Sequence, residues 1–392
     1  MKSNMRPIFL FVLTLFYYGV NAQKPMPIYS FATQLQPVSW YAEQSKLWKV
    51  EIDKNQSNAY AWYGYYRSTR NLLRLDTTDK RPHSEKIAQI RKIIEDMGKA
   101  IPTTFEYNLC KWMFEGNNFD YLSYLKKVED LGADRTEHYS DMLGYGEVTR
   151  DISKRDKYAK KWLENAPYSP GLMYYNYNVL MGLKPNAILV TCGDNDTYPP
   201  WLLQAKGIRR DVVVINSSLI HIDNYRNALF KELGVNPWET DSIFASNPSN
   251  KELLKTRYQN LLVEHLSKNT QSRPVYIALT CGDDYTKPIA SSLYLTGLAF
   301  EYSNRPIDNI ALLKKNFEQV YNLDYIERPF FYDISEHYTK MTNSNYVVPY
   351  IKLYDHYKLA GDNQKAEMIQ RKVTFIVKGT PDEKQTLDYF KQ

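Results

Sequence analysis

The sequence contains little cysteine and histidine, which limits the chemistry it can support. Its 392 residues include three cysteines and six histidines. Three cysteines are too few for the disulfide framework of a small secreted domain. The sequence has no paired Cys-x-x-Cys, no His-Glu-x-x-His helix and no phosphate-binding glycine loop. These absences exclude the common zinc motifs and the P-loop class of nucleotide-binding protein.

Long apolar runs and a strong excess of charge are also missing. The apolar stretch at residues 8–18 is shorter than the 18 or more residues expected of a membrane-spanning helix. It follows Lys2 and Arg6 and precedes a small-residue cleavage site ending at Ala22, the pattern of a secretory signal peptide. We therefore expect cleavage after Ala22 and a periplasmic or secreted mature chain without a membrane span. Removing Lys2 and Arg6 lowers the formal net charge from +6 to +4, too small an excess to indicate a nucleic-acid partner.

What the sequence does contain is an acidic turn that occurs twice, each time after an apolar run. Residues 187–192 are followed by Gly-Asp-Asn-Asp at 193–196, and residues 275–280 are followed by Cys-Gly-Asp-Asp at 281–284. Each apolar run is typical of a buried strand that ends at a glycine. Such strands suit a parallel sheet covered on both faces, where ligands bind beyond the carboxyl ends of the strands. We expect the two strands to run parallel in one sheet, with both turns at its binding edge.

The remaining sequence divides into three regions after the signal peptide at 1–22. Residues 23–165 have helical periodicity and a weak tetratricopeptide-like rhythm of helix, polar turn and Ala-rich helix. Residues 166–310 alternate strands with helices, and residues 311–392 contain a helix hairpin. The predicted fold class is α/β, with a central parallel sheet domain flanked by tetratricopeptide-like α-helical regions.

Two details of this organisation remain open. The apolar stretch from Leu293 to Phe300 fits either a strand or a helix. Cys192 and Cys281 occupy equivalent positions at the two predicted strand ends, so a disulfide between them is conceivable if the strands are neighbours. Because a disulfide requires particular Cβ directions, we expect two free buried thiols instead.

Polar side chains at the predicted strand ends form the candidate ligand-binding site: Asp194, Asn195, Asp196, Asn216, Ser218, Asp223, Asp283 and Asp284. Carboxylates are hard oxygen ligands, so Asp194, Asp196 and Asp283 could hold Ca²⁺, Mg²⁺ or Mn²⁺. The structural alternative is that these residues form turns and helix caps, for which Asp and Asn are well suited. His221 with Asp223 could assist a serine nucleophile, but the sequence has no Gly-x-Ser-x-Gly elbow.

A longer motif surrounds the first acidic turn. It contains Gly-Asp-Asn-Asp-Thr-Tyr-Pro at 193–199, a Leu-rich helix from Trp201, Gly-Ile-Arg at 207–209 and an Asp-Val strand that ends in Asn-Ser-Ser-Leu at 216–219. This motif resembles the soluble C-terminal region of a family of unknown function, large bacterial membrane proteins whose membrane half is similar to protein O-mannosyltransferases. The resemblance extends weakly to about residue 376, and it does not include the membrane half.

The resemblance implies an envelope protein linked to surface glycans or export, and glycosyltransferase activity would belong to the missing membrane half. Helix pairs offer extended surfaces for protein partners, and the sheet edge offers a polar pocket. We therefore predict an exported periplasmic binding or interaction protein whose partner is a protein or a glycan of the cell envelope. The alternative is a divalent-metal-assisted hydrolase or transferase acting on a glycan or phosphoester. The sequence leaves open whether the protein is an enzyme.

Overall fold

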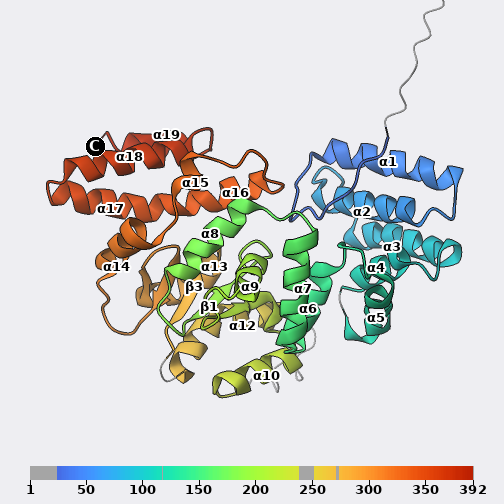
Figure 1. Cartoon of the computed structure of the whole chain (residues 1–392), viewed down its shortest axis with the longest axis horizontal. Coiled ribbons are helices and arrows are strands. Elements are labelled where there is room, and N and C mark those ends of the chain that lie inside the picture. The colour runs from blue at the N-terminus through green and yellow to red at the C-terminus, as the bar shows by residue number, and fades with distance from the viewer. Residues whose placement is uncertain (1–23, 117, 238–250, 271–272, 392) are drawn as a thin grey trace, which may run out of the picture.

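The computed structural model describes residues 24–116, 118–237, 251–270 and 273–391, with the backbone alone for 251–258 and 260. The predicted signal peptide lies outside the described residues. Helices make up most of the described chain, and a small sheet of five strands completes the fold. Figure 1 shows the N-terminal helices on one side of the sheet region and the C-terminal helices on the other.

The N-terminal part of the chain is built from helices joined by short turns. These are α1 (Val38–Lys54), α2 (Ala59–Leu75), α3 (His83–Ala100), α4 (Phe105–Phe114), the 3-10 turn η1 (Phe119–Tyr121), α5 (Leu122–Leu131), α6 (Tyr139–Val148), α7 (Ile152–Asn165) and α8 (Pro170–Met181). Side-chain hydrogen bonds cap the N-termini of several of these helices. At the start of α2, for example, the Asn58 side chain accepts a hydrogen bond from the Ala61 backbone N–H at 3.1 Å. Neighbouring helices pack as pairs, α1 with α2, α4 with α5 and α6 with α7. This arrangement is compatible with tetratricopeptide-like flanks.

The sheet has the strand order β2-β1-β3-β5-β4. Its strands are β1 (Ile188–Thr191), β2 (Val213–Asn216), β3 (Val275–Ala278), β4 (Leu293–Leu295) and β5 (Ala299–Tyr302). β1 runs parallel to both β2 and β3, with Ile188 opposite Val213 and Val275. The expectation that the strands before the two acidic turns run parallel in one sheet is confirmed, and the structure shows that they are direct neighbours.

The prediction of a parallel sheet is wrong for its other half. β5 pairs antiparallel with β3 and with β4. The stretch that fitted either a strand or a helix forms a strand, a tight turn and the start of another strand. So short a connection can join only antiparallel strands, and the sheet is therefore mixed.

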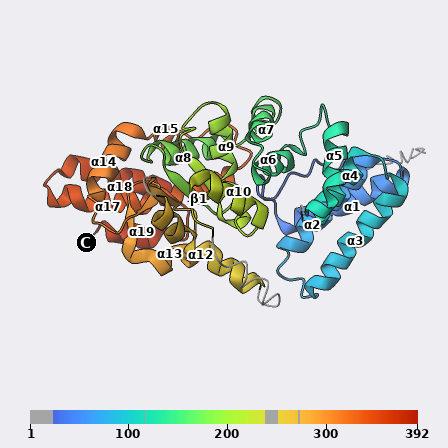
Figure 2. The same ribbon diagram turned by 90° about the horizontal axis from the view of Figure 1, so that it is seen from below.

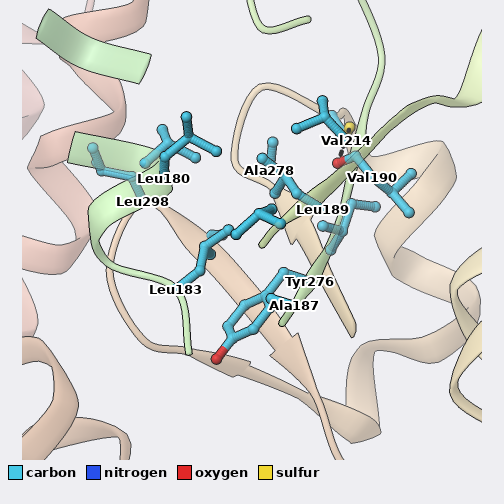
Figure 3. Close-up of a cluster of buried hydrophobic side chains, with 14 of the residues drawn as sticks. Leu180, Leu183, Ala187, Leu189, Val190, Val214, Tyr276, Ala278 and Leu298 are labelled. Atoms are coloured by element: carbon cyan, nitrogen blue, oxygen red, sulfur yellow. Dashed lines mark hydrogen bonds between the residues drawn. The ribbon is translucent and has the colours of Figure 1, made fainter. Parts of the chain in front are cut away.

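Helices bury the middle strands of the sheet. Every residue of β1 and β3 is buried, so both sheet faces are covered there. Figure 3 shows Leu180 of α8 and Leu183, two residues past the end of that helix, gathered with Leu189 and Tyr276 of the strands. After β1 comes α9 (Tyr198–Ala205), whose Trp201 indole N–H donates to the Val214 carbonyl of β2 at 3.4 Å. The turn η2 (Ser217–Leu219), α10 (Asp223–Leu233) and α12 (Lys251–Asn269) follow, and α12 packs on β3 and β5 (Figure 2).

The C-terminal part is helical again. It comprises α13 (Asp283–Thr286), η4 (Lys287–Ser292), α14 (Asn309–Lys315) continuing into the π-helical turn η5 (Asn316–Val320), α15 (Asp324–Glu327), α16 (Glu336–Asn343), η6 (Ser344–Tyr346), α17 (Val347–Leu359), α18 (Asn363–Val377) and α19 (Glu383–Tyr389). α17 and α18 form the predicted hairpin, and Gly361 between them has a φ of 77°, a conformation that favours glycine.

Two hydrophobic clusters hold the described chain together. The first, from Ile28 to Val128, is formed by α1 to α5 and the segment before α1. The second, from Trp112 to Val377, contains the sheet, the C-terminal helices and also α6 and α7. The division into three regions stays a sequence-based prediction. The boundary between the two clusters falls beside α6 and α7.

Cys192 and Cys281 form a disulfide, so the expectation of two free thiols is wrong. Their Cα atoms are 5.4 Å apart, within the usual range for a disulfide. The reason is the parallel pairing of β1 with β3, which places both cysteines side by side at the carboxyl ends of adjacent strands. The third cysteine, Cys110, is buried and free.

We predict that the disulfide contributes roughly 2–4 kcal/mol to the free energy of unfolding, because it closes a loop spanning 89 residues in the unfolded chain. The double variant Cys192→Ser plus Cys281→Ser should unfold at correspondingly lower urea concentration. Alkylation of the urea-unfolded protein should label one thiol per chain without reductant and three with it. Labelling of three thiols without reductant would contradict the disulfide.

Candidate functional site

The first acidic turn is held together by the carboxylate of Asp196. One oxygen accepts the Gly193 backbone N–H at 2.7 Å, and the other accepts the Cys192 backbone N–H at 3.0 Å and the Thr280 hydroxyl. Burial raises the pKa of Asp196, and these hydrogen bonds oppose the rise. Both oxygens therefore serve the structure: Asp196 joins the end of β1 to the segment after β3.

The other predicted residues of the sheet edge also have local partners or face solvent. The Asn216 side chain accepts the Ser218 backbone N–H at 2.8 Å and donates to the Thr197 hydroxyl at 3.1 Å. Asp223 pairs with Arg226 at 3.0 Å. Asp283 pairs with Lys287 at 3.1 Å and its side chain is 77% exposed, and Asp284, beside it in the first turn of α13, is also exposed.

The structure does not bring the three proposed metal ligands together. Both carboxylate oxygens of Asp196 already accept hydrogen bonds from N–H and O–H groups of the protein, whereas Asp283 lies on the surface. Across the described ranges, no group of three or more His, Cys, Asp or Glu side chains is arranged to hold a metal ion. The two acidic turns are thus neighbours through the sheet, but their carboxylates point to different surroundings.

Asp194 and Asn195, from the same turn, line a cleft of about 540 Å³ between the two hydrophobic clusters. One wall is α2 together with residues 27–33, and the opposite wall is α6, the segment after α7 and the first acidic turn. The Asn195 side chain donates to the Ala32 carbonyl at 3.0 Å, and the Tyr338 hydroxyl donates to the Phe31 carbonyl at 2.6 Å. These bonds fix the segment before α1 across one end of the cleft.

Two carboxyl groups in the cleft have raised pKa values. Asp194 retains contact with solvent, but the surrounding walls desolvate it and the neighbouring Asp196 repels its charge, so its pKa is raised. Desolvation also raises the pKa of Asp141 to about 6, although nearby Arg67 opposes the rise. The Asp141 carboxylate accepts the Trp112 indole N–H at 3.1 Å. The cleft therefore contains two acids that protonate more readily than a solvent-exposed aspartate.

Aromatic rings form another part of the lining. Trp162, in α7, lies 5.3 Å from Tyr168 and 5.7 Å from Tyr198 between ring centroids. Tyr60 and Tyr63 line the cleft from α2. The aromatic groups come from both hydrophobic clusters, and each of these rings carries a polar N–H or O–H group as well as an apolar face.

Sequence reasoning missed the arginines of α2. Arg67 and Arg70 both line the cleft, and Arg74 lies one turn further along the same helix. The signal was present in the sequence: three arginines at spacings of three and four share one helix face, and α2 contains no acidic residue to pair with them. Without the tertiary structure, a solvated helix face was the simpler interpretation.

Comparison with known proteins places the first acidic turn within a described domain. A family model described as TMEM260-associated domain 2 matches residues 173–234. This segment runs from α8 to α10 and supplies Asp194, Asn195 and Tyr198 to the cleft. TMEM260 is a membrane protein family, so the match is compatible with the resemblance to the soluble region of membrane proteins. No curated protein and no solved structure matches the chain.

None of the helices in the described part of the chain is both long enough and apolar enough to cross a bilayer.

The bonds of Asp196 predict that neither Asn nor Ala can replace it freely. Both carboxylate oxygens accept hydrogen bonds from N–H or O–H donors, so the amide of Asn would direct its own N–H₂ group at a donor. We expect Asp196→Asn and Asp196→Ala each to lower the free energy of unfolding by about 1–3 kcal/mol in urea titrations. The control Asp283→Asn should change it by less than about 0.5 kcal/mol. Equal losses for Asp196→Asn and the control would refute the bridging role.

The raised pKa of Asp141 predicts a specific pH dependence. The folded protein holds this proton up to about pH 6, whereas the unfolded chain releases it near pH 4, so the ionised carboxyl destabilises the fold progressively as pH rises through this window. Relative to Asp141→Asn, the wild type should lose about 1–3 kcal/mol of stability between pH 4 and pH 7. Paired thermal melts across this range test the difference. Parallel pH profiles for the two proteins would show that burial does not perturb Asp141.

Proposed function

We propose that the protein is an exported periplasmic binding protein that holds a saccharide of the cell envelope in the cleft between its two hydrophobic clusters. The observation that carries the proposal is the convergence of aromatic and polar side chains on this cleft, including Asp194 and Asn195 from the first acidic turn. A volume of about 540 Å³ lies within the range of small-molecule sites, roughly 300–1,000 Å³.

The chemistry of the lining favours a saccharide. A sugar ring presents apolar C–H faces and a rim of hydroxyl groups, so it is bound by aromatic faces together with hydrogen-bonding side chains. Trp162, Tyr168 and Tyr198 supply the first kind of contact, and Asp194 and Asn195, on the adjoining turn, supply the second. These five residues lie on the side of the second cluster, and the first cluster closes the cleft with α2, which adds Tyr60 and Tyr63 to the lining.

The geometry gives less support to the alternative, a divalent-metal-assisted hydrolase or transferase. That chemistry needs several carboxylates converging on open space. The Asp196 carboxylate is instead occupied by the Cys192 and Gly193 backbone N–H groups, and Asp283 faces solvent beside Lys287. Binding is therefore the function that we propose.

Export is supported by two separate features. The N-terminal sequence has the charge, apolar core and small-residue site of a signal peptide. The disulfide between Cys192 and Cys281 is the kind of bond that persists in an oxidising compartment such as the bacterial periplasm.

Calorimetric titration with a panel of neutral and acidic oligosaccharides tests the proposed function. We expect at least one member to bind, and Trp162→Ala to weaken that binding at least tenfold, about 1.4 kcal/mol, because a stacking face is lost. Tyr332→Ala is the matched control, since Tyr332 is a 65% exposed aromatic residue outside the cleft lining. Absence of binding across the panel, or equal affinity loss for both variants, would contradict the proposal.

A further inference from the structure

The three arginines of α2 lack the partners that arginines usually have. Within the described residues, no carboxylate oxygen lies within 4.0 Å of a nitrogen of Arg67, Arg70 or Arg74. Arg67 donates only to the sulfur of Met113, at 3.3 Å, and its guanidinium lies 5.8 Å from the centre of the Tyr63 ring. Arg74 lies over the ring of Phe31 at 4.8 Å. These aromatic and sulfur contacts leave the charged donors without an anion.

Arg67 is the least expected of the three. It is 8% exposed, and its Nε is a buried donor with no hydrogen-bond partner in the described part of the chain. Taking a guanidinium out of water without an anion is costly, and buried charges are normally paired. Asp141, an acid whose charge acts on Arg67, instead accepts hydrogen bonds from Trp112 and Ser140. Arg67 thus points a charged, unsatisfied donor group into the cleft wall.

The arginines also repel one another. The pKa of Arg70 is lowered first by desolvation and also by the like charges of Arg67 and Arg74, and Tyr66 and Asp141 oppose this lowering only in part. The charge of Arg74 opposes the rise in the pKa of Asp194 only in part, and the two residues do not form an ion pair. The positive charge along α2 is therefore larger than its acidic surroundings neutralise.

A second cavity continues the cleft along this helix. It has a volume of about 580 Å³ and shares Arg70, Met113 and Gly116 with the first. Its lining adds Arg74, Arg81, His83 and Lys86 and includes no acidic side chain, although Arg81 and Lys86 pair with Asp79 outside it, at 2.8 Å and 3.8 Å. From Arg67 to Arg74 the side chains pass from buried to exposed, so these arginines form a basic wall of one groove that runs through both cavities and opens to solvent. Glu137, Asp141 and Asp194 line the part of this groove that belongs to the first cavity.

We propose that this groove is the subsite for the negatively charged groups of an acidic saccharide, a sugar chain bearing carboxylate or phosphate, with Arg67 and Arg70 binding one such group at the inner end. The proposal rests on the proposed function, because the aromatic part of the same cleft would hold the sugar rings. Guanidinium groups suit this task, since their planar N–H pairs match the geometry of carboxylate and phosphate. Arg74 and the second cavity would accommodate the next charged unit.

The experiment compares charged and neutral ligands of matched size on the mature, disulfide-bonded protein. Titration calorimetry in a phosphate-free buffer is carried out with tetragalacturonate against a neutral galactose tetramer, and with mannose 6-phosphate against mannose. We expect binding in at least one charged arm, at least tenfold tighter than its neutral counterpart. The affinity should fall as NaCl is raised from about 50 to 300 mM, because salt screens the charges. The arm that binds identifies carboxylate or phosphate.

Variants of the arginines separate a binding role from a structural one. Arg67→Met and Arg70→Gln should each weaken binding of the charged ligand at least tenfold. The melting temperature of ligand-free Arg67→Met should be unchanged or higher, because an apolar side chain replaces an unpaired buried charge. Arg371→Gln, which removes an exposed arginine of α18 outside both cavities, is the matched control and should leave affinity unchanged. If Arg67→Met lowers the melting temperature by more than about 5 °C, the more accessible Arg70→Gln decides the question.

The possible failures are distinguishable. Equal binding of charged and neutral tetramers, insensitive to Arg70→Gln, would overturn the acidic-saccharide subsite and leave the proposed function standing. Binding of inorganic phosphate with no binding of any saccharide would overturn the saccharide as the ligand of these arginines. No binding of saccharide or phosphate would overturn both proposals.

Discussion

The fold around the candidate site depends on one carboxylate. Asp196 accepts backbone N–H groups from Cys192 and Gly193 and the hydroxyl of Thr280, so it joins the end of β1 to the end of β3 through hydrogen bonds. The disulfide from Cys192 to Cys281 makes the same connection covalently. Because the end of β1 is held in this way, the backbone of the acidic turn that follows it is also held in place. Asp194 and Asn195 can then line the cleft, while the carboxylate of Asp196 accepts the hydrogen bonds that hold the turn.

The cleft exists because two hydrophobic clusters meet without merging. The first cluster ends near α5, and α6 and α7 pack with the sheet. Side chains at such a boundary are only partly desolvated, so charged and aromatic groups remain there that would be excluded from either core. Asp141 and Asp194 show the consequence in their raised pKa values. A site at this boundary would also make ligand binding sensitive to how the two clusters pack.

The unpaired arginines of α2 and the ionised acids of the cleft each oppose folding. Sequences seldom retain such groups for stability, since apolar replacements of buried charges are often neutral or stabilising. Local disagreement with the rules of folding is most common where a protein binds or reacts. The disagreement here is concentrated on α2, α6 and the first acidic turn, three stretches far apart in the chain. Their meeting is a property of the tertiary structure.

The sequence by itself determined the helical ends of the chain, the hairpin at Gly361 and the parallel direction of β1 and β3 within one sheet. Apolar periodicity and turn glycines act locally, and short buried strands separated by helical sequence favour parallel crossovers. It could not determine the antiparallel strands β4 and β5. An apolar run as short as Leu293 to Phe300 fits both the 3.6-residue period of a helix and the two-residue period of a strand. It placed Asp194, Asn195 and Asp196 in one turn but did not separate their roles, because a carboxylate that accepts backbone N–H groups and one that faces a cleft have the same sequence pattern. Only the tertiary structure decided that Cys192 meets Cys281 and that Arg67 lines the same cleft as Asp194, since both depend on which strands and clusters become neighbours in space.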